Sequence, residues 1–291
     1  MKKFFKKIQH LVEYLLFLLM VRILRMLDID KSAYLCSRIA RLIGPFLPVT
    51  NIARKNLKNV FGESINQDKI IDELWDNFGR FIGEFPFVRT MSEDEIDKRI
   101  EIIGLEHTQK LKDNNQPFLL FTGHLANWDF ALRGIYKLYH QFGIIYRKAN
   151  NPYIDKIIRD FRSGHNLHLI SKGPKGAKEL IKSLKAGHAI AMLVDQKMNE
   201  GIDIPFFGRP AKTAHAIAKF ALQFNYPILP CQIIRTHGSY FKAIIHHPLE
   251  IKVSGDNDVD CYNIMLKINH LLEEWIISNK SQWFWFHNRW G

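Results

Sequence analysis

A histidine and an aspartate stand five positions apart in the segment 121-FTGHLANWDF-130. An imidazole held by a carboxylate can act as a general base, because the carboxylate fixes the ring tautomer and stabilises the imidazolium while the ring removes a proton from a hydroxyl. On one continuous helix, His124 and Asp129 would point about 140° apart and could not readily share a proton. They can meet only if His124 lies on the loop entering a helix and Asp129 lies in its first turns, where the helix dipole favours an acid.

The residues around the pair predict such a loop. An apolar run at 117–122 predicts a strand, Gly123 permits a tight exit from it, and a helix is expected to start near Asn127 or Trp128. No serine or cysteine of a nucleophile elbow accompanies the pair, so direct transfer to an acceptor hydroxyl is more natural than a covalent enzyme intermediate. The alternative is structural: His124 caps the helix and Asp129 is a solvated acid of its first turn.

The sequence that must position this pair divides into two regions with different hydrophobic patterns. Residues 30–100 show helical periodicity, for example in 67-QDKIIDELWDNFGRFIGEF-85, and short apolar runs alternate with amphipathic helices beyond residue 101. Strands are expected at 117–122, 143–147, 167–170, 188–195 and 227–235, with helices at 128–140, 152–163, 174–187 and 213–225. This alternation predicts an α/β fold with a mostly parallel mixed sheet flanked by helices. We divide the chain into an N-terminal membrane anchor helix (1–30), a helical segment packed on the core (31–100) and an α/β core (101–291).

Two further polar residues end predicted strands. Arg147 follows one strand and Asp195 ends another, and the carboxyl ends of parallel strands lie on one edge of a sheet. His124, Arg147 and Asp195 are therefore expected to converge on a single site. A guanidinium there could grip a phosphate or carboxylate bidentately, although a structural salt bridge is the alternative. Asp195 could equally serve only to brace a loop.

The net charge indicates the kind of partner, and the cysteines indicate the redox compartment. Lys and Arg number 41 against 29 Asp and Glu, a formal net charge of +12, so anionic partners are expected. Three cysteines without C-x-x-C spacing fit a reduced compartment. Five lysines recur at helical spacing and form either a solvated face or a landing surface for anionic lipid or an acidic protein: Lys172, Lys175, Lys178, Lys182 and Lys185.

The N-terminus combines early lysines with an apolar run. Residues 14–21 are apolar, Glu13 precedes them, and Arg22 and Arg25 follow. The segment is expected to lie in a membrane interface or to span it as a single pass, with its lysine-rich end on the cytoplasmic side; a buried amphipathic helix without lipid contact is the alternative. Aromatic residues at 283–290 suit either a membrane interface or core packing.

Other function classes are weaker. Basicity permits a nucleic-acid-binding protein, but no helix-turn-helix, zinc-finger or RRM signature is present. A metal hydrolase would need ligand spacings that the histidine pairs at 165/168 and 246/247 do not offer. An inactive membrane adaptor is disfavoured because both His124 and Asp129 are present.

Five separated blocks resemble one family. The stretch 122-TGHLANWDF-130 resembles the H-x4-D block of the glycerolipid and lysophospholipid acyltransferase superfamily. Four further blocks resemble a narrower group, the late acyltransferases of lipid A biosynthesis, which are the lauroyl and myristoyl enzymes. These blocks are GRFIGEF (79–85), IIYRKANNP (144–152), LVDQKMNEGIDIPFFGRPAKT (193–213) and QWFWFHNRWG (282–291). The resemblance covers nearly the whole chain in order. It implies a fold like that of glycerol-3-phosphate acyltransferase.

The resemblance also implies an activity. An enzyme of this family works on the cytoplasmic face of a Gram-negative inner membrane and moves a fatty acyl chain from acyl carrier protein to a hydroxyl of the Kdo-bearing lipid A precursor. His124 would be the base and Asp129 its orienting acid. The residues matching the family's substrate-binding positions are Arg147, Asp195, Gln196, Phe207 and Gly208. Expected partners are acyl carrier protein, the lipid A precursor and anionic inner-membrane lipid, with no nucleic acid, metal or cofactor. A phospholipid acyltransferase of the lysophosphatidic acid type is the alternative.

Overall fold

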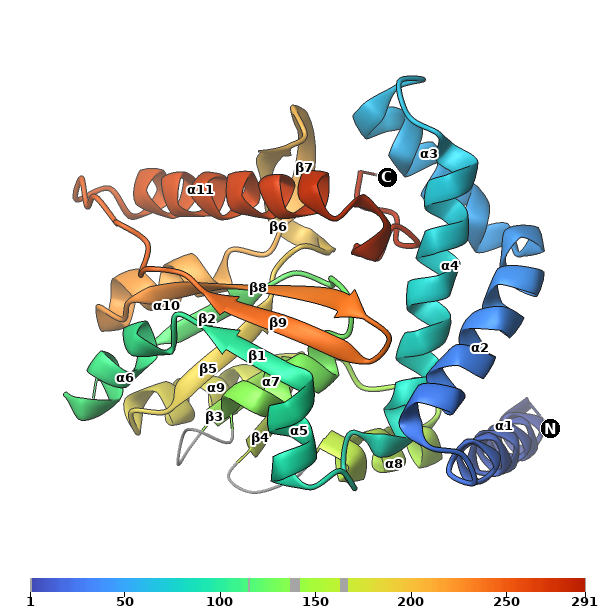
Figure 1. Cartoon of the computed structure of the whole chain (residues 1–291). Helices are drawn as coiled ribbons and strands as arrows, with labels where there is room; N and C mark the ends of the chain where they lie inside the picture. Colours follow the sequence, from blue (N-terminus) through green and yellow to red (C-terminus); the bar gives the residue numbers. More distant parts are fainter. Residues whose placement is uncertain (1, 115, 137–141, 163–166, 291) are drawn as a thin grey trace.

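Helices of the N-terminal third stand across the carboxyl ends of the central strands (Figure 1). The computed structural model describes residues 2–114, 116–136, 142–162 and 167–290. The N-terminal elements are α1 (Lys2–Leu24), α2 (Ile29–Ile43), η1 (Gly44–Phe46), α3 (Pro48–Phe61), α4 (Gln67–Glu84), η2 (Phe85–Phe87) and α5 (Glu93–Arg99). The helical character expected from the periodicity over residues 30–100 is confirmed.

A seven-stranded sheet forms the centre of the molecule. Its order is β1-β9-β8-β2-β5-β3-β4, built from β1 (Ile100–Ile103), β2 (Leu119–Thr122), β3 (Phe142–Tyr146), β4 (Leu167–Ser171), β5 (Ala189–Leu193), β8 (Ile228–His237) and β9 (Tyr240–Ile245). Strands β8, β2, β5, β3 and β4 run parallel, and β9 turns back antiparallel to β8. The predicted α/β class with a mostly parallel mixed sheet is confirmed, whereas β1 and β9 were not anticipated.

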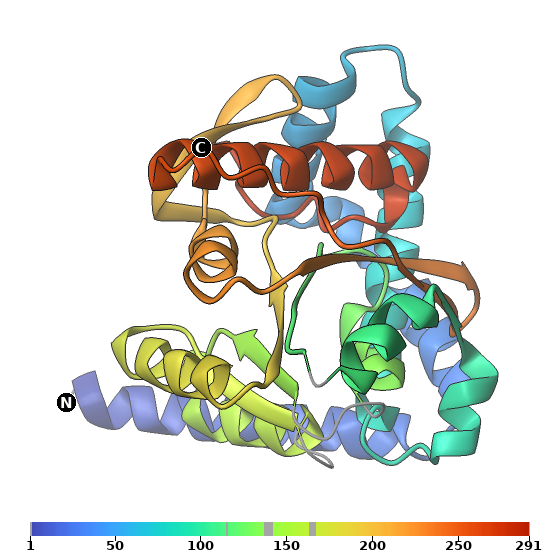
Figure 2. The same cartoon turned by 90° about the vertical axis from the view of Figure 1, so that its left-hand side faces the viewer.

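Helices cover both faces of the sheet, as continuous apolar strands require. The remaining elements are α6 (Leu105–Asp113), α7 (Trp128–Tyr136), α8 (Pro152–Arg162), α9 (Pro174–Lys185), β6 (Lys197–Phe206), β7 (Arg209–Thr213), α10 (Ala216–Phe224), α11 (Asn257–Ser278) and η3 (Lys280–Gln282). Strand β2 shows the division: Phe121 packs in the core that includes α10, α11 and α4, whereas Leu120 packs with Phe130 of α7. Figure 2 shows α11 and the β6–β7 hairpin together above the sheet.

Helices α2 and α4 approach each other closely at two glycines of α4. A Cβ atom at Gly79 would lie 2.5 Å from the carbonyl oxygen of Cys36, and one at Gly83 would lie 2.5 Å from that of Ser32. Larger residues therefore cannot occupy these positions without moving the helices apart. Ser32 Oγ also donates a 2.7 Å hydrogen bond to the Gly83 carbonyl. This packing explains the glycines of 79-GRFIGEF-85 and fixes the end of α4.

Helix α1 lies along the outside of the molecule and contacts α8 (Figure 2). Asn151, at the start of α8, donates hydrogen bonds to the carbonyl of His10 (2.7 Å) and to Glu13 Oε2 (2.9 Å). Val21 and Leu24 are buried, but most other apolar side chains of α1 are exposed. Among the described residues, no helix has the length and apolar character needed to cross a membrane.

Candidate active site

The loop between β2 and α7 carries His124. Asn127 caps α7, because its Oδ1 accepts a 3.0 Å hydrogen bond from the Phe130 backbone N–H. Ala126 adopts a left-handed backbone with φ of +50°, which is uncommon for a residue with a side chain. His124 is half-buried, with 15% of its side chain exposed. The expected placement, His124 on the entering loop and Asp129 in the first helical turn, is confirmed.

The carboxylate that holds His124 is Asp195, which follows β5. Its Oδ1 lies 2.6 Å from His124 Nδ1, and its Oδ2 accepts a 2.6 Å hydrogen bond from the His124 backbone N–H. Trp283 Nε1 donates a third hydrogen bond, 2.7 Å long, to Oδ2. The bond at Nδ1 leaves Nε2 as the ring nitrogen that can accept a proton. Of the two readings left open for Asp195, the structure favours a place in the site.

Asp129 forms an ion pair with Arg162 instead. Its Oδ2 accepts hydrogen bonds from Arg162 Nε (3.1 Å) and Nη2 (2.5 Å), which joins α7 to α8. The described contacts include no hydrogen bond between Asp129 and His124. The expectation that Asp129 orients the imidazole directly is therefore corrected. The physical reason is that the neighbouring parallel strand β5 brings Asp195 beside β2, whereas α7 carries Asp129 towards α8.

The environment of Asp195 lowers the pKa of its carboxyl. It is fully buried, and burial alone would raise the pKa of its carboxyl. The charge of His124, the hydrogen bonds from His124 and the charge of His287 act in the opposite direction and lower the pKa well below its ordinary value. A buried carboxylate that stays charged can fix the tautomer of His124 and stabilise its imidazolium form.

The C-terminal segment 282–290 closes the site. The Ala126 N–H donates to the Gln282 carbonyl (2.9 Å), and the Phe284 N–H donates to the His124 carbonyl (2.9 Å). Trp283 is fully buried beside Asp195, so core packing, and not a membrane interface, is the environment of this tryptophan. The sequence offered one signal for this role: an indole N–H needs a hydrogen-bond partner when it is buried.

A small pocket opens beside His124. Its volume is about 210 Å³ including the open mouth, and most of its wall is apolar or aromatic. The lining residues come from α4, the His124 loop and the C-terminal segment: Leu74, Asn77, Phe78, Phe81, His124, Ala126, Trp128, Gln282, Trp283 and Phe284. The Trp128 ring packs edge-on against His124 with ring centroids 4.7 Å apart. The imidazole therefore borders a largely apolar surface.

Arg147 lies at the same sheet edge as His124, as expected. It follows β3, which is two strands from β2, and is exposed. No ion pair of Arg147 is found among the described residues. Lys148 and Lys172 are exposed beside it, and the Lys172 N–H bonds to the Tyr146 carbonyl (2.9 Å). A cationic surface thus borders the site.

The three remaining predicted site residues lie differently. Gln196 follows Asp195 and is partly buried. Phe207 and Gly208 form the turn of the β6–β7 hairpin, and both have positive φ angles (+52° and +67°), as a type I′ turn requires. The Phe207 N–H donates a 2.6 Å hydrogen bond to Glu273 of α11. The pocket beside His124 does not include Phe207 or Gly208.

Within the described ranges, no cluster of three or more His, Cys, Asp or Glu side chains is arranged to hold a metal ion. The chemistry that the described groups can perform is proton transfer at His124 with electrostatic support from Asp195.

Comparison with known proteins identifies the family. The family model described as bacterial lipid A biosynthesis acyltransferase matches residues 1–291. The chain belongs to this family. Lipid A acyltransferases of this family are acyl-transferring enzymes, and the family resemblance of the separated blocks is confirmed.

Two curated relatives of this family member share little sequence identity with it. A phosphatidylinositol mannoside acyltransferase of Mycobacterium tuberculosis is 21% identical over 185 residues, which are 61% of this chain and 58% of that protein. A lipid A biosynthesis acyltransferase of Haemophilus influenzae is 23% identical over 188 residues, 61% of this chain and 57% of that protein. The matches thus span less than three fifths of the length of these relatives.

Among solved structures, a 1-acyl-sn-glycerophosphate acyltransferase of Thermotoga maritima is similar with a TM-score of 0.40. It is 14% identical and covers 84% of this chain and 99% of its own.

A double-mutant cycle tests whether Asp129 of this family member acts through Arg162. We expect Asp129→Asn and Arg162→Gln each to lower kcat/KM, and the double variant to lose no more than the worse single variant, because the two side chains work as one pair. Steady-state kinetics of the four proteins measure the coupling, expected at about 0.5–3 kcal/mol. Losses that multiply would show that Asp129 acts independently of Arg162.

Proposed function

We propose that this protein transfers a fatty acyl group from acyl carrier protein to a hydroxyl of the Kdo-bearing lipid A precursor. Family membership supports acyl transfer in lipid A biosynthesis. The single observation that carries the acid–base part is the buried Asp195 carboxylate on His124 Nδ1, beside a largely apolar pocket. The acyl donor and the acceptor hydroxyl named here are part of our proposal.

The chemistry follows from the free ring nitrogen. His124 Nε2 accepts the proton of the acceptor hydroxyl while the oxygen attacks the thioester carbonyl carbon. The new C–O bond forms, the C–S bond breaks, and the thiolate of the carrier leaves and takes the proton from the imidazolium. Asp195 stabilises the imidazolium between these steps. Because the acceptor oxygen attacks the thioester directly, no covalent enzyme intermediate forms.

The cationic surface beside the site supports an anionic substrate or donor. Arg147 is exposed, as are Lys148 and Lys172, and a guanidinium can bind a phosphate or carboxylate through two hydrogen bonds. The five lysines from Lys172 to Lys185 are all exposed, so they are free to steer acidic acyl carrier protein. Gln196, Phe207 and Gly208 are proposed as substrate-binding residues on the family resemblance alone.

An acceptor panel tests the substrate class. Purified protein in detergent is given radiolabelled acyl–acyl carrier protein with the tetra-acylated Kdo-lipid A precursor, lysophosphatidic acid or a phosphatidylinositol mannoside, and the products are separated by chromatography. We expect acylation of the lipid A precursor at a rate at least tenfold above the other two. Product with lysophosphatidic acid or the mannoside alone would exclude the lipid A acceptor.

We further propose that α1 and the outer face of α2 contact the cytoplasmic face of an inner membrane. Both helices lie on the same outer side of the molecule (Figures 1 and 2). Large exposed apolar side chains gather there: Phe4, Phe5, Ile8, Leu11, Val12, Leu15, Leu16, Leu19, Ile23, Ile39, Leu42, Ile43 and Phe46. Exposed Lys6, Lys7, Arg22 and Arg38 would meet anionic headgroups.

Sedimentation with vesicles tests this surface. We expect wild-type protein to bind vesicles that contain anionic phosphatidylglycerol more strongly than neutral phosphatidylcholine vesicles. Replacing Leu15, Leu16 and Leu19 by serine removes three exposed apolar side chains and is expected to lower binding at least tenfold, since each buried side chain contributes roughly 1.5–3 kcal/mol. The matched control replaces exposed Val253 and Val259, elsewhere on the molecule, by serine. Equal losses in both variants would contradict the assignment.

A further inference from the structure

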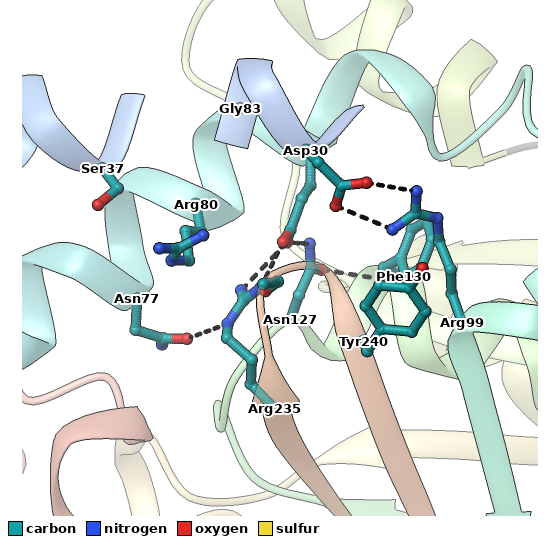
Figure 3. Close-up of polar contacts among 12 residues, drawn as sticks. Asp30, Ser37, Asn77, Arg80, Gly83, Arg99, Asn127, Phe130, Arg235 and Tyr240 are labelled. Carbon is teal, nitrogen blue, oxygen red and sulfur yellow. Dashed lines mark hydrogen bonds and ion pairs between the residues drawn. The ribbon is translucent and has the colours of Figure 1, made fainter. Parts of the chain in front are cut away.

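A buried ion pair joins the end of α4 to β8. The Glu84 side chain is fully buried and pairs with Arg235, whose side chain is 7% exposed. Arg235 Nη2 lies 3.1 Å from Glu84 Oε2, and the same guanidinium donates from Nε to Asn77 Oδ1 (2.9 Å) and from Nη1 to the Gly238 carbonyl (2.6 Å). Figure 3 shows Asn77, Arg235 and Asn127 converging on this point. Burying two charges is costly unless they are fully bonded, so such a network calls for an explanation.

The network reaches the His124 loop by two routes. Asn127 Nδ2 donates a 2.6 Å hydrogen bond to Glu84 Oε2, and Asn127 is the residue that caps α7. The second route runs through the backbone of Arg235, which exchanges two hydrogen bonds (2.8 and 3.0 Å) with the side chain of Gln282. The Gln282 carbonyl in turn accepts the N–H of Ala126.

Both routes converge on the residues that follow His124. Ala126 holds an uncommon backbone conformation, and such a conformation persists only when its surroundings enforce it. The hydrogen bonds to Ala126 and Asn127 supply that enforcement from α4 and β8. They fix the backbone two and three residues beyond the imidazole, on the side of the loop opposite to Gly123.

We propose that Glu84 and Arg235 are positioning residues, which hold the loop so that His124 meets Asp195 and the substrate in a productive geometry. The proposal rests on the acyl transfer proposed above. Neither residue lines the pocket beside His124, so each acts through the residues that it bonds: Asn127 for Glu84, and Asn77 and Gln282 for Arg235. A misplacement of about 1 Å in a catalytic group can lower a rate by about 10², which sets the scale of the expected effect.

A second ion pair in the same region provides an internal control. Asp30 of α2 accepts two hydrogen bonds from Arg99 (3.0 and 2.7 Å), and the Arg99 guanidinium lies over the ring of Tyr240 (Figure 3). This pair also ties the helical layer to the sheet through an acid and a bidentate arginine. Its described contacts do not reach the His124 loop.

Glu84→Gln and Asp30→Asn are therefore compared in the full-length protein. We expect Glu84→Gln to lower kcat about 10- to 100-fold with KM changed less than twofold, because geometry and not substrate binding is affected. Asp30→Asn should keep kcat within about twofold of the wild-type value. Equal losses of kcat in the two variants would overturn the proposal, since the effect would then come from weaker attachment of the helical layer.

A milder pair of variants keeps the test valid if Glu84→Gln fails to fold. Asn127→Ser retains an oxygen that can cap α7 but removes the amide that reaches Glu84, and Asn66→Ser makes the same change at the cap of α4. We expect only Asn127→Ser to lower kcat, by about tenfold or more, and to shift the low-field NMR signal of the Nδ1 proton between His124 and Asp195. Unchanged kcat and an unchanged signal in Asn127→Ser would overturn the proposal.

The NMR signal needs no substrate. If the wild-type protein transfers no acyl group to any acceptor, the proposed function fails, while the signal still reports whether Glu84 and Asn127 hold the loop. The two failures are therefore distinguishable.

Discussion

Asp195→Asn is expected to lower kcat about 10³- to 10⁴-fold, the size of effect that the same change has in Ser-His-Asp triads. Asp195 Oδ2 accepts N–H bonds from the His124 backbone and Trp283, so an asparagine oxygen must take that place. Its amide group then faces His124 Nδ1 as a donor. This selects the tautomer that carries a proton on Nε2, and the ring can no longer accept one from the hydroxyl. Steady-state kinetics with the best acceptor of the panel measure the loss.

The control for this variant is Asp203→Asn, which changes an exposed acid paired with Lys212 on the β6–β7 hairpin. It should leave kcat within about twofold, because exposed ion pairs contribute little. A loss below tenfold in Asp195→Asn would assign the orienting role elsewhere, with Asp129 as the first candidate.

The Asp195→Asn variant should also differ from the wild type in how its stability depends on pH in the acidic range. The folded-state pKa of Asp195 is lowered, so ionised Asp195 stabilises the fold above the ordinary aspartate pKa near 4, and this contribution is lost as pH falls through the lower folded-state value. Denaturant unfolding between about pH 2 and 6 should show a weaker acid dependence in Asp195→Asn than in the wild type. Identical pH dependence in both proteins would contradict an ionised Asp195.

His124→Ala is expected to lower kcat about 10²- to 10⁴-fold, which corresponds to roughly 3–5 kcal/mol of transition-state stabilisation. The alanine removes the only group that this mechanism uses to accept the hydroxyl proton. KM should change less than kcat, because the aromatic pocket wall stays in place. The measurement is the single-turnover rate with enzyme in excess, which separates chemistry from product release.

His237→Ala is the matched control, since His237 is exposed and stacks on Tyr240 at the β8–β9 turn. Circular dichroism of both variants verifies the fold. Activity within a few-fold of wild type in His124→Ala would show that the general-base assignment is wrong.

Much of the fold can be predicted from the sequence because the patterns that indicate its strands are local. Five predicted strands correspond to β2, β3, β4, β5 and β8, since continuous apolar runs mark strands that are buried on both faces. His124, Arg147 and Asp195 lie at the same edge because parallel strands share a direction, and Asp195 joined the site for that reason.

The prediction that Asp129 orients His124 is wrong because the true partner, Asp195, lies in a distant segment of the sequence. Asp129 lies closer in sequence, but Asp195 is brought in by the pairing of β5 with β2, which a spacing rule cannot show. The sequence does not predict a role for Glu84 or Arg235 at the site, because isolated charged residues are normally exposed to solvent. Here both are buried, because they pair with each other where α4 meets β8.

The closure of the site by segment 282–290 also sets an order in time. Translation delivers His124 and Asp195 long before Gln282, Trp283 and Phe284, so on a nascent chain the His124 carbonyl, the Ala126 N–H and Asp195 Oδ2 lack these partners. These three hydrogen bonds, which hold the His124 loop and Asp195 from outside the sheet, can therefore form only after this segment has been synthesised.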